Sequence, residues 1–136
     1  MPMQPVHPVV FIDGECVLCN RLATWLLRRD RNRVHRVATL QGRTAHEMLG
    51  APAADPAGWA IVLVDGDGTH DRSEAVLRIA TRLGGLSGFG ARLARRVPVS
   101  VRDRAYDAVA RRRYRWFGKQ DRCRLPRPGE EDVFLP

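Results

Sequence analysis

The chain has 136 residues, 44% of them apolar, which fits one domain able to bury a core without metal or disulfide staples. It contains no run of about 18 apolar residues, which argues against a membrane span, and its start lacks the basic and long apolar regions of a signal peptide. The net charge is +8, but the arginines are spread along the chain, which favours solvated helix faces over a nucleic-acid or membrane site. We therefore expect a cytoplasmic protein, in which stable disulfides are rare.

The first part of the chain predicts a strand–helix–strand unit. Residues 8–13 form a short apolar run with β-branched and aromatic side chains, typical of a buried strand, and Asp13-Gly14 is a turn signal. Residues 17–31 predict a helix, whose expected core face consists of Leu18, Leu22, Trp25 and Leu26. Residues 34–39 alternate apolar and polar, which indicates a second strand, parallel to the first.

The middle of the chain predicts a hairpin and another helix. A short helix over 44–49 and a loop over 50–58 lead to a central strand over 59–65. The sequence Asp65-Gly66-Asp67-Gly68 is typical of a hairpin because Gly accepts positive φ, and residues 69–71 are the expected return strand. The next helix begins with Asp71 or Ser73 as its cap and has Glu74 in its first turn. We expect its core face to consist of Ala75, Val76, Ile79, Ala80 and Leu83.

Two further helices are expected over 86–97 and 100–117. One side of the second gathers Val101, Ala105, Ala108, Val109 and Trp116. The tryptophans Trp25, Trp59 and Trp116 are expected in the core. The prediction is one α/β domain: a βαβ-ββα core over about 8–85, helices over about 86–118 and an extended tail over 119–136.

Cys16 and Cys19 form a C-x-x-C pair at the first turn of the first predicted helix. A helix N-terminus favours an anion, and a redox cysteine needs the thiolate, which is the form that attacks a disulfide. We expect Cys16 to be the accessible nucleophile, and Cys19, one turn further on and more buried, to resolve the mixed disulfide. No bound cofactor or metal is needed, because the cysteines carry the electrons. The expected partner is a protein or small molecule that carries a thiol or disulfide.

Asp13 has two interpretations, and both can hold. A partly buried carboxylate three residues before Cys16 can accept the proton of Cys19. Asp is also a turn former that caps the helix that follows. Cys123, after the last predicted helix, has no evident activating helix end, and we expect it to be inert.

Other chemistry remains open for the cysteine pair. Both cysteines could be small core residues. They could also bind zinc with Cys123 and one histidine, the candidates being His7, His35, His46 and His70, although no second C-x-x-C or H-x-x-x-H occurs. Either case would make the chain a non-catalytic binding module, the main alternative to an enzyme.

Residues 13–19 match the D-x-x-C-x-x-C signature of the DCC family of thiol-disulfide oxidoreductases. Residues 114–119 and 123–126 also resemble this family, as does the Asp65-Gly66 hairpin that precedes Ser73 and Ala75. The resemblance spans nearly the whole chain, and it implies a thioredoxin-like fold and dithiol–disulfide activity. The wider thioredoxin group places a cis-proline before the third strand. Here Trp59 opens that strand, with Pro52 and Pro56 the nearest prolines, so we expect a different substrate-binding edge.

Overall fold

A four-stranded mixed sheet forms the centre of the computed structural model, which describes residues 7–31, 33–50, 61–118 and 128–135. The strands are β1 (Val9–Ile12), β2 (Arg36–Thr39), β3 (Val62–Asp65) and β4 (Gly68–Asp71), in the order β2-β1-β3-β4. β1 pairs parallel with β2 and antiparallel with β3, and β3 and β4 form the predicted hairpin, with Gly68 at a φ of 129°. This confirms the predicted α/β, thioredoxin-like core.

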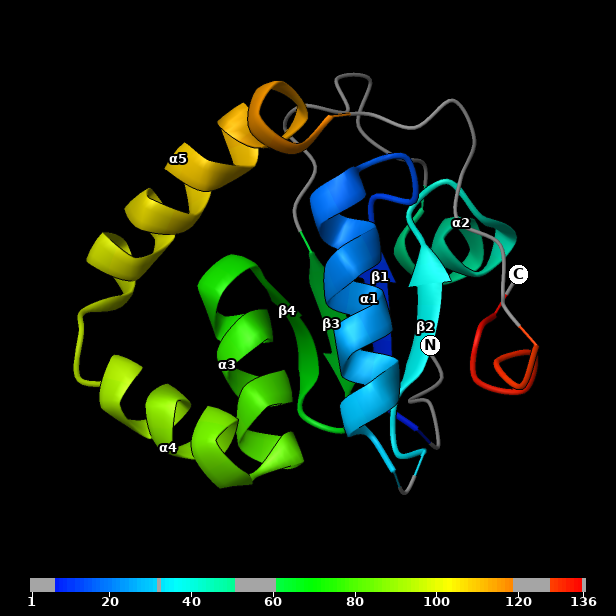
Figure 1. Cartoon of the computed structure of the whole chain (residues 1–136), viewed down its shortest axis with the longest axis horizontal. Helices are drawn as coiled ribbons and strands as arrows, with labels where there is room; N and C mark the ends of the chain where they lie inside the picture. Colours follow the sequence, from blue (N-terminus) through cyan, green and yellow to red (C-terminus); the bar gives the residue numbers. More distant parts are fainter. Residues whose placement is uncertain (1–6, 32, 51–60, 119–127, 136) are drawn as a thin grey trace.

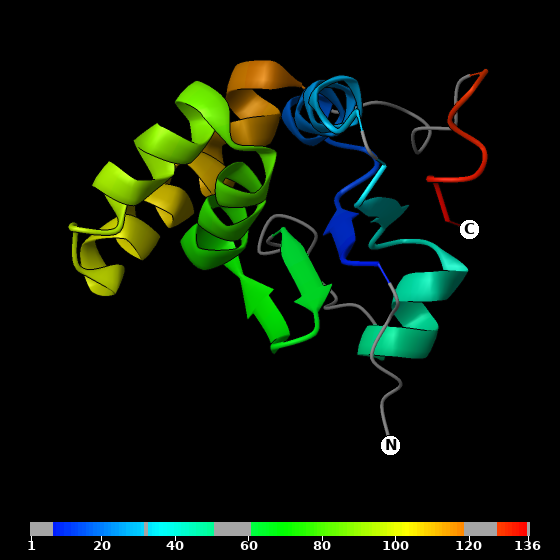
Figure 2. The same cartoon turned by 90° about the horizontal axis from the view of Figure 1, so that it is seen from below.

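Helices cover both faces of the sheet, and this explains why β1 is apolar throughout (Figures 1 and 2). On one face, Val10 and Ile12 pack with residues of α1 (Val17–Arg29) and α3 (Arg72–Leu83). On the other face, Val9 and Phe11 pack against α2 (Arg43–Leu49). Because successive strand residues point to opposite faces, a fully buried strand has no polar position.

The end of the chain returns to the sheet. Val37 of β2 donates its N–H to the Val133 carbonyl at 2.8 Å and accepts the N–H of Leu135 at 2.7 Å. Phe134 forms a parallel bridge with Val37 and is buried in the main core. The described part of the expected tail therefore adds an edge segment beside β2.

Two C-terminal helices, α4 (Gly85–Ala94) and α5 (Val99–Phe117), curve around α3 on the outside of the domain (Figure 1). The predicted cap of α3 is partly wrong. Asp71 is the N-cap residue but makes no side-chain cap hydrogen bond. Instead, the backbone N–H and the hydroxyl of Ser73 both donate to Asp103 of α5. A carboxylate from another helix therefore satisfies this helix end, and Glu74 lies in the first turn as predicted.

The predicted core faces of the helices need correction. On α1, Ala23 and Leu26 are buried, whereas Leu22 is 42% exposed and Trp25 is also exposed. On α3, Leu77 is buried instead of Val76, which is 39% exposed. The expected apolar side of α5 is largely in solvent, where Val101, Val109 and Trp116 are exposed.

The inward contacts of α5 include two polar ones, since Asp103 accepts from Ser73 of α3 and Tyr106 accepts the N–H of Ile61 just before β3. Tyr106 also packs against the main core. Trp25 and Trp116 are both exposed, so the prediction that they are core residues is wrong. Trp59 lies outside the described residues.

Candidate functional site

The cysteine pair lies at the end of β1 where the chain turns into α1, as predicted. Cys16 is the N-cap residue of α1, with φ −85° and ψ 125°. Its N–H donates to the Asp13 carbonyl at 3.1 Å, and its carbonyl accepts the Asn20 N–H at 3.0 Å. Both cysteines are thiols rather than a disulfide. A short turn therefore connects the buried strand to the first helical turn and places the two cysteines at positions i and i+3.

The expected order of exposure is wrong. Cys16 is 0% exposed, whereas Cys19 is half-buried. The end of α5 lies against the start of α1, where the Gly118 carbonyl accepts the Val17 N–H at 3.3 Å. This long-range contact uses one N–H of the helix N-terminus and closes over the start of α1. The sequence alone could not show it.

Asp13 is 2% exposed and anchors the turn before Cys16. Its Oδ1 accepts the Glu15 N–H at 3.1 Å, and the side chain of Gln41 donates to the same oxygen at 2.7 Å. Gln41 Oε1 in turn accepts the Gly14 N–H at 3.0 Å. The turn-forming interpretation of Asp13 is confirmed, but no side chain caps α1.

Sequence reasoning missed two side chains that hold this turn. Gln41 follows β2 and reaches Asp13 because β1 and β2 are parallel neighbours, which brings their carboxyl ends together. Asn20 is buried in α1, and its Nδ2 donates to the Gly14 carbonyl at 2.9 Å. The β1–β2 pairing was the one signal that could have pointed to Gln41.

Cys19 and Asp13 line the same cavity of about 350 Å³. Its other walls come from Ile12 of β1, Ile61 and residues of α1, α3 and α5, and they are almost entirely apolar. A carboxylate and a thiol, which are groups that can exchange a proton, therefore border the same largely apolar cavity.

Among the residues that the structure describes, no three His, Cys, Asp or Glu side chains are grouped, and the zinc alternative also requires Cys123. His35 Nδ1 lies 3.2 Å from Asp30, and burial lowers the pKa of His35 even though Asp30 raises it. His70 Nε2 lies 3.0 Å from Asp65. Cys123 lies outside the described residues.

The described residues contain neither a membrane-spanning helix nor a cis peptide bond. Within the described ranges, no helix is long and apolar enough to cross a membrane. No peptide bond in the same ranges is cis, and Pro52 and Pro56 lie outside them.

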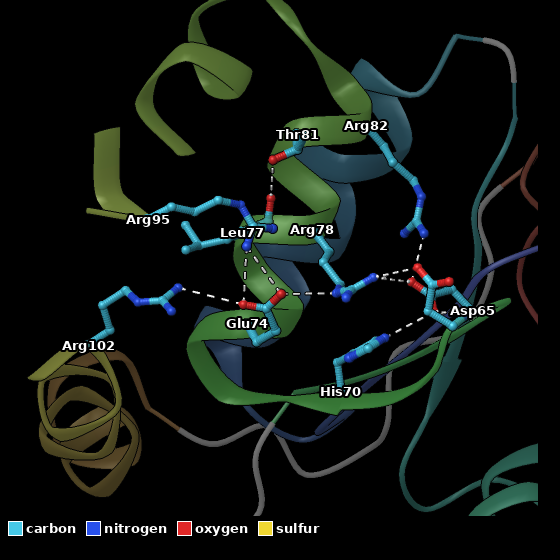
Figure 3. Close-up of polar contacts among 10 residues, drawn as sticks. Asp65, His70, Glu74, Leu77, Arg78, Thr81, Arg82, Arg95 and Arg102 are labelled. Atoms are coloured by element: carbon cyan, nitrogen blue, oxygen red, sulfur yellow. Dashed lines mark hydrogen bonds and ion pairs between the residues drawn. The ribbon is translucent and has the colours of Figure 1, made fainter. Parts of the chain in front are cut away.

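A charged cluster occupies the other end of the sheet (Figure 3). Val64 pairs with Val9, so Asp65 lies beyond the start of β1, opposite the end that leads to Cys16. Asp65 accepts from Arg82 at 2.7 Å and pairs with His70 and Arg78. Burial by itself raises the pKa of Asp65, but hydrogen bonds from Arg82, the Asp67 amide and His70 lower it more, to about 2. This buried carboxylate therefore stays ionised and joins β3 to β4 and α3.

Comparison with known proteins identifies the family of the chain. The family model for DCC1-like thiol-disulfide oxidoreductases matches residues 10–119. The chain is 33% identical over 131 residues to the uncharacterized protein YuxK of Bacillus subtilis, covering 94% of this chain and 93% of that protein. It is 34% identical over 120 residues to a chloroplastic DCC family protein of Arabidopsis thaliana, covering 88% and 70%. No solved structure matches the chain significantly. The chain thus belongs to the DCC1-like family of thiol-disulfide oxidoreductases.

Proposed function

We propose that the protein catalyses reversible exchange between its Cys16/Cys19 dithiol and the disulfide of a partner, with Asp13 as proton acceptor. The observation that carries the proposal is the C-x-x-C pair at the start of α1, with a buried carboxylate in the cavity that Cys19 lines. The helix N-terminus favours thiolate at Cys16, and the i, i+3 spacing keeps the two sulfurs near enough to join. The partner is a protein or small molecule that carries a thiol or disulfide.

The reaction needs no other electron carrier. One thiolate of the pair attacks a partner disulfide, forms a mixed disulfide and releases the first partner thiolate. The second thiolate attacks the protein sulfur of that mixed disulfide, forms the Cys16–Cys19 bond and releases the second partner thiolate. Two electrons and two protons pass from the dithiol to the partner. Asp13 accepts the proton of the half-buried Cys19 thiol and returns it to a departing thiolate.

Single-turnover exchange with bis(2-hydroxyethyl) disulfide tests this proposal. Reduced wild-type protein is mixed with the disulfide, and the oxidised product is identified by mass and by peptide mapping. We expect an intramolecular Cys16–Cys19 disulfide in the wild type and in a Cys123→Ser control. Cys16→Ser and Cys19→Ser are expected to form no such bond. Wild-type protein that reacts no faster than the Cys16→Ser/Cys19→Ser double variant would contradict the proposal.

The competing function is a binding module in which the cysteine pair is structural. The complete burial of Cys16 favours it, because buried Cys often acts as a small apolar residue. The same experiment decides between the two functions. A structural pair predicts loss of stability in both serine variants and no oxidised product in the wild type.

A further inference from the structure

The cavity beside Cys19 is part of a longer groove. It shares Ile12, Leu22, Ile61 and Val76 with a second cavity of about 470 Å³ that extends along α1 to Trp25. The combined groove, called here the Cys19 groove, lies between α1 and α3 over the end of β1, with α5 closing the cysteine end. Leu22 and Val76, which were predicted to be core residues but are exposed, form its shared middle section.

The walls of the Cys19 groove offer few polar contacts. Beside Cys19 these are Asp13 and Tyr106, and in the second cavity Arg21. The Tyr106 hydroxyl already accepts the Ile61 N–H at 2.8 Å, and Asp13 is held by Gln41. A charged, peptide-like disulfide would leave its polar groups poorly paired in such walls, which costs free energy. An apolar group would instead gain by leaving water.

We propose that the Cys19 groove binds the apolar substituent of a small disulfide, and that Cys19 is the sulfur that joins this substrate. This inference rests on the proposed function and adds to it the substrate class and the point of entry. The cavity volumes fall within the range of small-molecule sites, which are about 300–1,000 Å³, concave and mostly apolar. Cys19 lines the groove, whereas Cys16 is fully buried. A disulfide that enters the groove therefore meets Cys19 first.

The two steps follow from this placement. Asp13 takes the proton of Cys19, and the Cys19 thiolate attacks one sulfur of the apolar disulfide. A Cys19–substrate bond forms, the substrate S–S bond breaks, and the first thiolate leaves with the proton from Asp13. The Cys16 thiolate, which the helix N-terminus favours, then attacks Cys19 Sγ. The protein disulfide forms, and the second substrate thiolate leaves and takes a proton from solvent, which balances the proton that Cys16 had already released to solvent.

A matched pair of substrates tests the substrate class. Dipropyl disulfide and bis(2-hydroxyethyl) disulfide have equally long chains and differ by methyl in place of hydroxyl. Each protein rate is divided by the rate of dithiothreitol with the same disulfide, which removes the difference in intrinsic reactivity. We expect the corrected rate to be about tenfold higher for dipropyl disulfide, because a hydroxyl buried in apolar walls lacks partners.

Variants locate that preference. Leu22→Gln places an amide in the shared section of the groove. It is expected to reduce the ratio of the two corrected rates, dipropyl disulfide over bis(2-hydroxyethyl) disulfide, at least threefold. Leu86→Gln is the matched control, because Leu86 is 91% exposed and not among the groove residues, and its ratio is expected to equal that of the wild type. In addition, Cys16→Ser is expected to accumulate an adduct on Cys19, whereas Cys19→Ser accumulates none.

The outcomes separate this inference from the function on which it rests. Equal corrected rates for the two disulfides, with exchange intact, would overturn the apolar substrate class. An adduct on Cys16 in Cys19→Ser, with none on Cys19 in Cys16→Ser, would overturn Cys19 as the point of entry. No protein-dependent exchange with either disulfide would overturn the proposed function and this inference with it.

Discussion

The two sides of α3 contact very different surroundings. One side carries Glu74, Arg78 and Arg82, whose charges pair with Asp65 of β3, Asp67 of the hairpin turn, Arg95 at the end of α4 and Arg102 of α5 (Figure 3). The other side carries Val76 and Ile79, which line the apolar Cys19 groove. Through Glu74, charge pairs thus tie the end of α4 and the start of α5 to α3. The comparison predicts that damage to the first side lowers stability, while damage to the second changes chemistry.

The largest effect on stability is expected from Asp65→Ala. The Asp65 side chain is fully buried and accepts from Arg82 at 2.7 Å, so its loss leaves Arg82, Arg78 and His70 without their shared anion. We expect a decrease of about 3 kcal/mol in the free energy of unfolding, measured by urea denaturation. Asp67→Ala is the control, because Asp67 pairs with Arg78 from a side chain that is 75% exposed. Its cost should stay below about 1 kcal/mol. Similar costs for both variants would contradict the central role of Asp65.

A smaller effect should appear on acidification. The pKa of Asp65 falls from 3.8 to about 2 on folding, so ionised Asp65 stabilises the folded state at pH values above its unfolded pKa. This contribution is lost as the pH falls from about 4 to about 2, and it amounts to about 2 kcal/mol. We expect Asp65→Asn to have a shallower decline of unfolding free energy over that window. If the unfolding free energies of the wild type and the variant declined in parallel between about pH 4 and about pH 2, Asp65 would not titrate in this way.

On the cysteine side, Gln41→Ala removes the donor to Asp13 and the acceptor of the Gly14 N–H. We expect a loss of about 1.5 kcal/mol of stability. Slower oxidation of the cysteine pair should accompany it, because Asp13 is no longer held. Gln41→Glu keeps the acceptor for the Gly14 N–H but loses the donor and sets a second carboxylate against Asp13, so it should recover little of the stability and little of the rate. Full recovery of the rate by this variant would show that the Asp13 contact is not needed.

The smallest effect is expected from Tyr106→Phe. The ring stays in the groove wall, but the Ile61 N–H loses its acceptor, which lies 2.8 Å away. The expected cost is about 1 kcal/mol in urea denaturation. An unchanged stability would mean that this contact does not fix α5 to the start of β3.

The elements themselves were predictable because their signals are local. The Asp13-Gly14 turn, the β3–β4 hairpin and the helices that flank it depend on spacings within a few residues. The C-x-x-C pair at the start of α1 was found in the same way.

The side chains that shape the site were harder to predict, because they depend on where distant elements dock. Gln41 reaches Asp13 across the β1–β2 pairing, and the Gly118 carbonyl meets α1 from the end of α5. Apolar periodicity assigned Leu22 and Val76 to the core, but it could not show that these positions face a groove. The docking of distant elements also decides which thiol is accessible. The sequence therefore predicted Cys16 as the more exposed thiol, whereas Cys19 is the more exposed one in the structure.

The redox equilibrium of the cysteine pair tests the central claim most directly. Wild-type protein is equilibrated in dithiothreitol buffers of graded ratio, the remaining thiols are alkylated, and the disulfide is mapped by peptide mass. We predict one two-electron transition in which Cys16 and Cys19 are lost together and found joined in one peptide. A Cys16 that stays alkylatable across the whole range, or a disulfide that joins Cys19 to Cys123, would contradict the account.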